Sequence, residues 1–206
     1  MHRYMQQGAE AIHSVNPDVL VIMSGLVFDT DLSFVENRPV NISFAGKLVF
    51  ELHWFSSSRG IFWAESNAND VCGDFFGEVK SLASFLLDKG FPLFVSEFGI
   101  DETTDRVKED RYIDCLLGWL SENDVDWSIW TLAGSYYLRE GSPGADEPFG
   151  VLSRDWIYAR NPILERLPFV QSALRGPGSQ TENRALLDAK PTGRSTALIR
   201  ELPISN

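Results

Sequence analysis

Basic residues are scarce in this chain of 206 residues. It has 18 lysines and arginines against 29 aspartates and glutamates, a formal net charge of −11, and the basic residues form no run or stripe. A protein of this charge repels phosphate backbones, so nucleic acid is not expected as a partner. A neutral ligand such as a sugar meets no such repulsion.

Long apolar segments are also missing. No stretch reaches the ~20 apolar residues that span a bilayer, and residues 1–7 lack the apolar centre of a signal peptide. We therefore expect no membrane partner, and nothing in this chain directs export.

Cysteine is limited to Cys72 and Cys115. Two cysteines without closely spaced histidines cannot build a structural zinc site. One disulfide or two buried thiols remain open, and we favour two buried thiols.

Four apolar segments have the composition of strands that are buried on both faces in a parallel sheet. They are residues 19–23, 47–53, 92–98 and 125–130. Each is preceded or followed by a segment of helical periodicity. The alternation predicts an α/β fold with right-handed crossovers, either an open doubly wound sheet or a barrel.

Helices are expected at both ends of this series. Residues 3–15 carry an apolar stripe that includes Tyr4, Ile12 and Val15, and a last helix is expected at about 162–174, with Pro168 as a kink. We assign residues 1–175 to one folded unit. Residues 176–206 lack aromatics and are predicted to stay unfolded.

The carboxyl ends of parallel strands are where α/β proteins gather functional groups. This rule selects Ser24, His53, Glu97 and Trp130. A carboxylate that ends an apolar strand is costly unless it is solvated, paired or used, so Glu97 is the leading candidate. A lone histidine such as His53 is more often structural. Trp54 and Trp130 suit sugar stacking as well as core filling.

Taken in order, these strand ends resemble glycoside hydrolase family 5, the cellulase family, and its plant cellulase-like branch in particular. The resemblance covers about residues 1–178. The motifs that carry it are Ser-Gly-Leu at 24–26, Phe-Glu-Leu-His-Trp-Phe at 50–55, Phe-Pro-Leu-Phe at 91–94, Ser-Glu-Phe-Gly at 96–99 and Asn-Asp-Val-Asp-Trp-Ser-Ile-Trp at 123–130.

The resemblance implies a partial TIM (β/α)8 barrel, roughly strands 5 to 8, and a retaining endo-β-glucanase-like hydrolase of polysaccharides that needs no cofactor or metal. Glu97 is then the nucleophile, His53 its supporting neighbour, and Trp130 and Trp54 bind the sugar. The family often has tyrosine two residues after that histidine, where this chain has Phe55. Its members are usually secreted.

The second carboxyl group is the missing part of this expectation. A retaining glycosidase needs two, about 5 to 5.5 Å apart. The family places its acid/base at the end of the fourth strand, which would lie just upstream of Met1. Glu147, in Asp-Glu-Pro, imitates the family's Asn-Glu-Pro motif but follows the last strand, and we do not assign it the role. A complete barrel takes about 250 residues, so we expect a truncated form whose partner is the N-terminal half.

Two other readings stay open. The chain could be a non-catalytic carbohydrate-binding or scaffold protein. It could also be an unrelated doubly wound α/β protein, although no Gly-rich phosphate loop follows any predicted strand.

Overall fold

The computed structural model describes residues 2–170, which form one compact unit. The sequence prediction of an unfolded tail at 176–206 lies outside the described residues. The elements run, in chain order, α1 (His2–Val15), β1 (Val21–Met23), α2 (Phe34–Asn37), β2 (Leu48–His53), η1 (Ser56–Ser58), α3 (Phe62–Glu65), α4 (Ala68–Val79), η2 (Lys80–Ser84), α5 (Phe85–Asp88), β3 (Leu93–Glu97), α6 (Arg106–Asn123), β4 (Asp126–Trp127), α7 (Ile163–Arg166) and η3 (Leu167–Val170).

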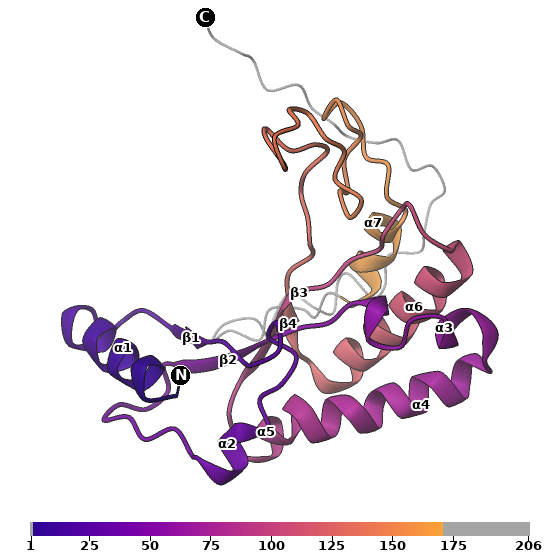
Figure 1. The fold of residues 1–206 in the computed structure, drawn as a ribbon. Helices are drawn as coiled ribbons and strands as arrows, with labels where there is room; N and C mark the ends of the chain where they lie inside the picture. The colour runs from indigo at the N-terminus through magenta and orange to yellow at the C-terminus, as the bar shows by residue number, and fades with distance from the viewer. Residues whose placement is uncertain (1, 171–206) are drawn as a thin grey trace, which may run out of the picture. The chain divides into compact units, whose positions relative to one another are not determined.

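The strands form one parallel sheet in the order β1-β2-β3-β4 (Figure 1). All four predicted strands are present, and only the last is much shorter than expected. The chain still follows β3 beyond β4, since the amide of Ser128 donates to the carbonyl of Val95 at 2.9 Å and that of Trp130 to Phe98 at 2.8 Å. The α/β prediction is therefore confirmed.

The sheet buries one face and leaves the other open. Alternate residues such as Met23, Phe50 and Val95 belong to the same buried core as the apolar sides of α4 and α6. Residues of the opposite parity, such as Glu51 and Ser96, are only half buried, and Ile22 is 47 % exposed. This alternation identifies a face covered by helices and a face that, in a barrel, would line the interior.

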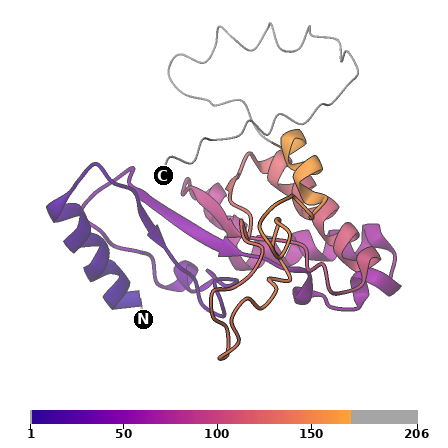
Figure 2. The same cartoon turned by 90° about the horizontal axis from the view of Figure 1, so that it is seen from above.

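Helix α1 lies beside β1 at one side of the molecule, and α6 with α7 lies at the opposite side (Figure 2). Helix α1 forms where the sequence predicts it, but it buries Ala9, while Tyr4, Ile12 and Val15 of the apolar stripe are exposed. No described element covers that stripe.

The last predicted helix is present as α7 followed by the single-turn segment η3, which contains Pro168. None of the helices in the described part of the chain is long and apolar enough to cross a membrane.

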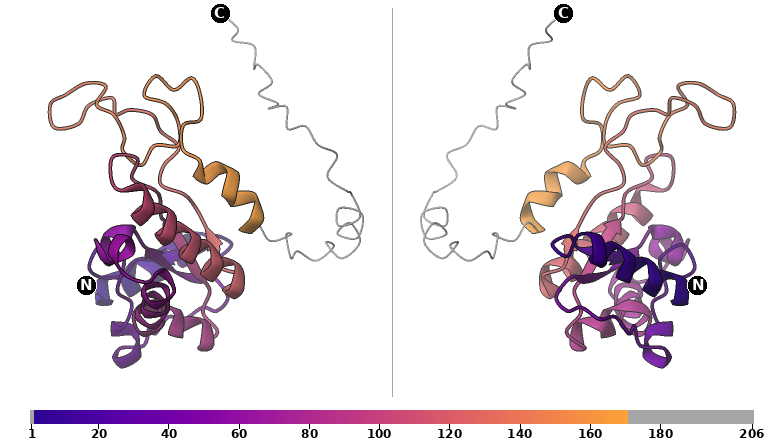
Figure 3. Two further views of the ribbon diagram at one scale, coloured as in Figure 1. Left: turned by 90° about the vertical axis from the view of Figure 1, so that its right-hand side faces the viewer. Right: turned by 90° about the vertical axis from the view of Figure 1, so that its left-hand side faces the viewer.

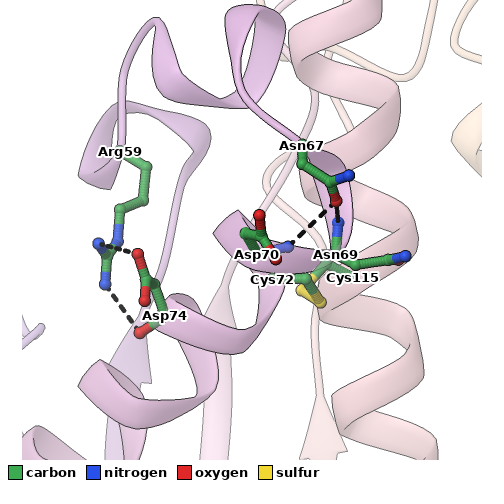
Figure 4. The surroundings of a disulfide bond; sticks show 7 residues. All are labelled: Arg59, Asn67, Asn69, Asp70, Cys72, Asp74 and Cys115. Atoms are coloured by element: carbon green, nitrogen blue, oxygen red, sulfur yellow. Dashed lines mark hydrogen bonds and ion pairs between the residues drawn. A yellow bond between two sulfur atoms is a disulfide. The ribbon is translucent and has the colours of Figure 1, made fainter.

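A disulfide joins α4 to α6, so our preference for two buried thiols was wrong. Cys72 and Cys115 are bonded, with their Cα atoms 5.8 Å apart, inside the range that a disulfide requires (Figure 4). The two helices pack side by side, and that packing could not be read from a spacing of 43 residues. The start of α4 is fixed by Asn67, whose side chain accepts from the amides of Asn69 and Asp70.

Aromatic packing at the end of β2 fixes the strand end that carries His53. Trp54 meets Phe75 edge-on, and Trp63 contacts both Phe75 and Tyr112. The Tyr112 hydroxyl donates to the carbonyl of Trp54. Burial, and next the nearby Glu109 carboxylate, raises the pKa of Tyr112 well above its ordinary value, so the hydroxyl stays protonated and remains a donor.

Candidate active site

The ends of β2 and β3 bring His53 and Glu97 together. The two residues are register partners across the parallel pair, next to an irregularity between Leu52 and His53. The amide of Trp54 donates to the carbonyl of Glu97 at 3.0 Å. His53 Nδ1 then lies 3.4 Å from Glu97 Oε2, and both side chains keep contact with solvent. Two polar groups selected from the sequence only as strand ends thus face each other.

Asp29 joins this pair, although no motif in the sequence singled it out. Its Oδ2 lies 3.7 Å from His53 Nδ1, and its carbonyl accepts from the amide of His53 at 2.9 Å. Both carboxylates therefore flank one imidazole nitrogen. The usable signal in the sequence was an apolar Leu-Val-Phe run at 26–28, separated by two residues from the end of β1, where a solvated loop would be polar.

The turn that delivers Asp29 is strained. Val27, Phe28 and Asp29 have φ angles of 50°, 56° and 60°, a region that non-glycine residues seldom adopt and that is least suited to β-branched valine. The turn is closed by hydrogen bonds between Leu26 and Asp31. Strain of this kind persists only where the surrounding structure enforces it, and it is concentrated at functional sites.

Glu51 forms a second polar group on the open face of the sheet. Its carboxylate accepts from the Ser24 hydroxyl and, at 2.9 Å, from the Ser96 hydroxyl. Ligand atoms of Asp29, Glu51 and His53 all lie within 4.8 Å of one another, a spacing compatible with a metal ion. Because Glu51 already accepts from two serines and His53 faces Glu97, we interpret the group as neighbouring polar side chains with other partners.

A cavity of about 550 Å³ opens over this site. Its lining residues come from the strained turn, from the ends of β2 and β3 and from η1; they are Val27, Phe28, Asp29, Thr30, His53, Phe55, Ser57, Ser58 and Glu97. Phe55, where the family often has tyrosine, packs edge-on against Phe149 and has no hydroxyl to donate to Glu97.

The predicted aromatic platforms divide between surface and core. Trp130 is 39 % exposed at the end of the fourth strand, where it can meet a ligand. Trp54 is only 1 % exposed and lies in the aromatic core, so its assignment to substrate binding is corrected. Side chains alternate along an extended chain, and the residue after His53 therefore points to the helix side.

Glu147 is shielded from any substrate in this structure. It is 1 % exposed, its Oε1 accepts from the amide of Phe149 at 3.1 Å, and Arg139 Nη1 lies 3.9 Å from its Oε2. These contacts give it a structural role in the segment after β4, as its position in the sequence indicated.

Known proteins resemble this chain over most of its length. The family described as Cellulase (glycosyl hydrolase family 5) matches residues 1–135. A "Glycosyl hydrolase 5 family protein" of Chamaecyparis obtusa is 43 % identical over an alignment of 183 residues, and the match covers 85 % of this chain and 33 % of that protein. The chain thus spans about a third of its curated relative.

Solved structures show the same fold. An endocellulase of Pyrococcus horikoshii in complex with cellotetraose superposes with a TM-score of 0.65 at 16 % identity, over 82 % of this chain and 47 % of the endocellulase. The catalytic domain of the major endoglucanase of Xanthomonas campestris pv. campestris gives 0.63 at 16 % identity, over 82 % and 48 %. The described sheet and helices therefore correspond to about half of such a barrel.

Proposed function

Because the chain belongs to glycosyl hydrolase family 5, we propose that it supplies the nucleophile side of a retaining O-glycosyl hydrolase site that acts on a β-linked glucan or mannan. The observation that carries the proposal is the pairing of Glu97 with His53 at the carboxyl end of the sheet, within a cavity open to solvent. The cellotetraose complex of the Pyrococcus endocellulase supports an oligosaccharide as substrate class.

Glu97 attacks the anomeric carbon in this proposal. Its carboxylate displaces the leaving-group oxygen and forms a covalent glycosyl ester, which water then hydrolyses with net retention. The imidazole of His53 contacts the same carboxylate and orients it. Trp130, exposed at the end of the fourth strand, provides an apolar face against which a pyranose ring stacks.

The acid/base is proposed to come from the other half of the barrel. A retaining site needs a second carboxyl group about 5 to 5.5 Å from the nucleophile. Among the described residues Glu147 is buried, and Glu51 is bonded to two serines. Asp29 shares a histidine nitrogen with Glu97 and stabilises that histidine instead.

The uncovered parts of the structure support the same proposal. Ile22 on the open face and the stripe of Tyr4, Ile12 and Val15 on α1 expose apolar surface. The strands β1 and β4 each have a single partner strand among the described residues. Four further strand and helix units would pair with both edges and cover these surfaces.

The test compares this chain with a complete barrel that contains it, using reducing-sugar release from carboxymethylcellulose, barley β-glucan and mannan. Activity in the complete barrel alone is expected. An activated 2-fluoro glycoside should then label the peptide that contains Glu97, and Glu97→Gln should abolish labelling while Glu102→Gln, a matched exchange at a nearby acid, retains it. Label on another peptide removes Glu97 from the nucleophile role.

A non-catalytic carbohydrate-binding role is the second candidate, favoured by the presence of an exposed Trp130 beside an incomplete carboxylate pair. Sugar binding without turnover in the complete barrel, lost on Trp130→Ala, would establish it in place of hydrolysis.

We also propose that the protein works in an oxidising compartment, as is usual for the family. The bond between Cys72 and Cys115 supports this, because disulfides persist in secreted proteins and are rare in the cytosol. Quantitative alkylation of both thiols in protein freshly isolated from its native tissue would contradict it.

A further inference from the structure

The long segment between β4 and α7 carries exposed aromatic side chains that do not line the cavity over Glu97. Figures 1 and 3 show this segment, in orange, as long excursions at the carboxyl end of the sheet. Trp156 is 50 % exposed and Tyr158 is 60 % exposed. None of the roles assigned above uses either residue.

The backbone holds this segment in one conformation. The excursion of residues 152–159 is closed by the bridge between Leu152 and Ala159 and by the amide of Ser153 donating to Tyr158 at 2.7 Å. Arg160 ties it to the neighbouring excursion, because its Nη1 lies 2.8 and 2.9 Å from the two carboxylate oxygens of Asp146. The backbone on either side of Trp156 is therefore held by these hydrogen bonds.

The indole of Trp156 is fixed as well as exposed. Its Nε1 donates to the Ser135 hydroxyl at 3.0 Å, and its backbone has φ +66°, a left-handed conformation that tryptophan rarely adopts. The ring edge lies over Gly134, where an added Cβ would come within 3.3 Å of Trp156 Cδ1. A large apolar residue held in a strained conformation, with its polar atom satisfied and its face open to solvent, is suited to ligand contact.

A cavity of about 460 Å³ adjoins this tryptophan and shares no lining residue with the cavity over Glu97. It is lined by Ser135, Gly144, Ser153, Arg154, Asp155 and Tyr158. Ser135 lines the cavity and accepts from the indole, so Trp156 is hydrogen-bonded to the cavity wall.

The cavity is lined by both a hydrogen-bond donor and a hydrogen-bond acceptor. Arg154 Nε donates to the carbonyl of Gly144 at 2.9 Å, and its Nη groups make no hydrogen bond or ion pair with any described residue. The Ser153 hydroxyl, and next the amide of Ile157, lowers the pKa of Asp155, which stays a charged acceptor at neutral pH. A fixed aromatic face beside separate donors and acceptors matches a pyranose, which has one apolar face and a rim of hydroxyls.

We propose that Trp156 and this cavity form a second sugar-binding site, in which a ring of a neutral oligosaccharide stacks on the indole while Arg154 and Asp155 bind its hydroxyls. The ligand class rests on the proposed function, and the net charge of −11 disfavours an anionic polymer. Gly134, which supports the indole, follows Trp130 by four residues, so the two backbones are at most ~14 Å apart. One oligosaccharide can therefore reach both tryptophans.

The test is a titration of the 206-residue chain with cellotetraose, followed by the indole N–H signals of its six tryptophans in 15N-edited NMR spectra. Each signal is assigned by a Trp→Phe variant. Trp54, Trp63 and Trp119 are at most 4 % exposed and serve as internal controls that should not move. We expect saturable shifts at Trp156, and an affinity at this site about ten-fold weaker in Trp156→Ala, the loss of one stacking contact.

Tyr4→Ala removes an aromatic side chain on α1 that is 75 % exposed, more than Trp156, and is expected to leave the affinity unchanged. A Ser135→Ala variant keeps the ring but frees it, and it should weaken binding less than Trp156→Ala. Shifts at Trp130 alone would overturn this inference and leave the proposed function standing. Shifts at Trp156 alone would support it and remove Trp130 from sugar binding by this chain. Saturable shifts at neither would overturn this inference, while the labelling of Glu97 in the complete barrel decides the proposed function separately.

Discussion

Removing the disulfide should lower the free energy of unfolding by about 4 kcal/mol. The bond between Cys72 and Cys115 closes a loop with a sequence separation of 43. In the chain-entropy treatment such a loop restricts the unfolded chain by about 13 cal/mol/K, which is about 4 kcal/mol at 25 °C. The bond also holds α4 against α6. Both helices contribute side chains to the core that β2 buries.

The perturbation is the double variant Cys72→Ala with Cys115→Ala, and the assay is urea unfolding followed by tryptophan fluorescence, together with a thermal scan. For a chain of this size each kcal/mol shifts Tm by about 2 to 4 °C, so a fall of about 8 to 16 °C is expected. The oxidised wild type should lose the same amount when it is treated with a reductant.

Reduction of the wild type is the control that separates the effect of losing the S–S bond from the effect of replacing the cysteine side chains. If the reduced wild type keeps the stability of the oxidised protein, the entropic reasoning is wrong. A double variant much weaker than the reduced wild type would instead show that packing of the sulfur atoms matters more than the bond.

Three further predictions follow from single residues. Tyr112→Phe should reduce the loss of stability at alkaline pH. Because the pKa of Tyr112 is raised in the native state, its contribution to stability is complete below pH ~10, where the unfolded tyrosine begins to ionise, and is lost as the pH rises toward the native pKa. Urea midpoints of wild type and variant, measured below and above pH ~10, will show the difference. Trp54→Ala should cost about 3 to 5 kcal/mol in urea unfolding, as expected for a core aromatic residue; full stability with lost sugar affinity would restore it to the binding site. Asp29→Asn, in a complete barrel, should lower kcat with little change in KM, because it acts on His53 and not on the sugar; a raised KM at constant kcat would refute a positioning role.

The sequence was sufficient for the sheet and for the central pair of the site. Continuous apolar strands predicted the sheet and the strand-end rule selected His53 and Glu97, while the resemblance to the cellulase family implied that the two are neighbours. The strand ends were less certain. The fourth strand pairs regularly with β3 only at Asp126–Trp127. Beyond it, the chain is joined to β3 by the separate backbone hydrogen bonds of Ser128 and Trp130.

Contacts between distant segments could not be predicted in this way. Asp29 reaches His53 only through three consecutive left-handed residues, which no local composition encodes. The orientation of Trp54 depends on a one-residue alternation at the end of a strand. The pairing of Cys72 with Cys115 depends on how two helices pack, which spacing along the chain does not determine.

The segment after β4 is held together largely through its backbone, and this has a consequence for how its specificity can change. Added Cβ atoms at Gly134 and Gly150 would lie 1.9 Å and 2.3 Å from the carbonyl oxygens of Ser153 and Ala133, so these two positions tolerate no other residue without a shift of the chain. Exposed positions such as Tyr137 and Leu138 carry no comparable constraint. In a saturation library over this segment, folded variants should keep both glycines and accept many residues at the exposed positions. Side chains of this segment can therefore be exchanged to select new ligand preferences while the backbone stays the same.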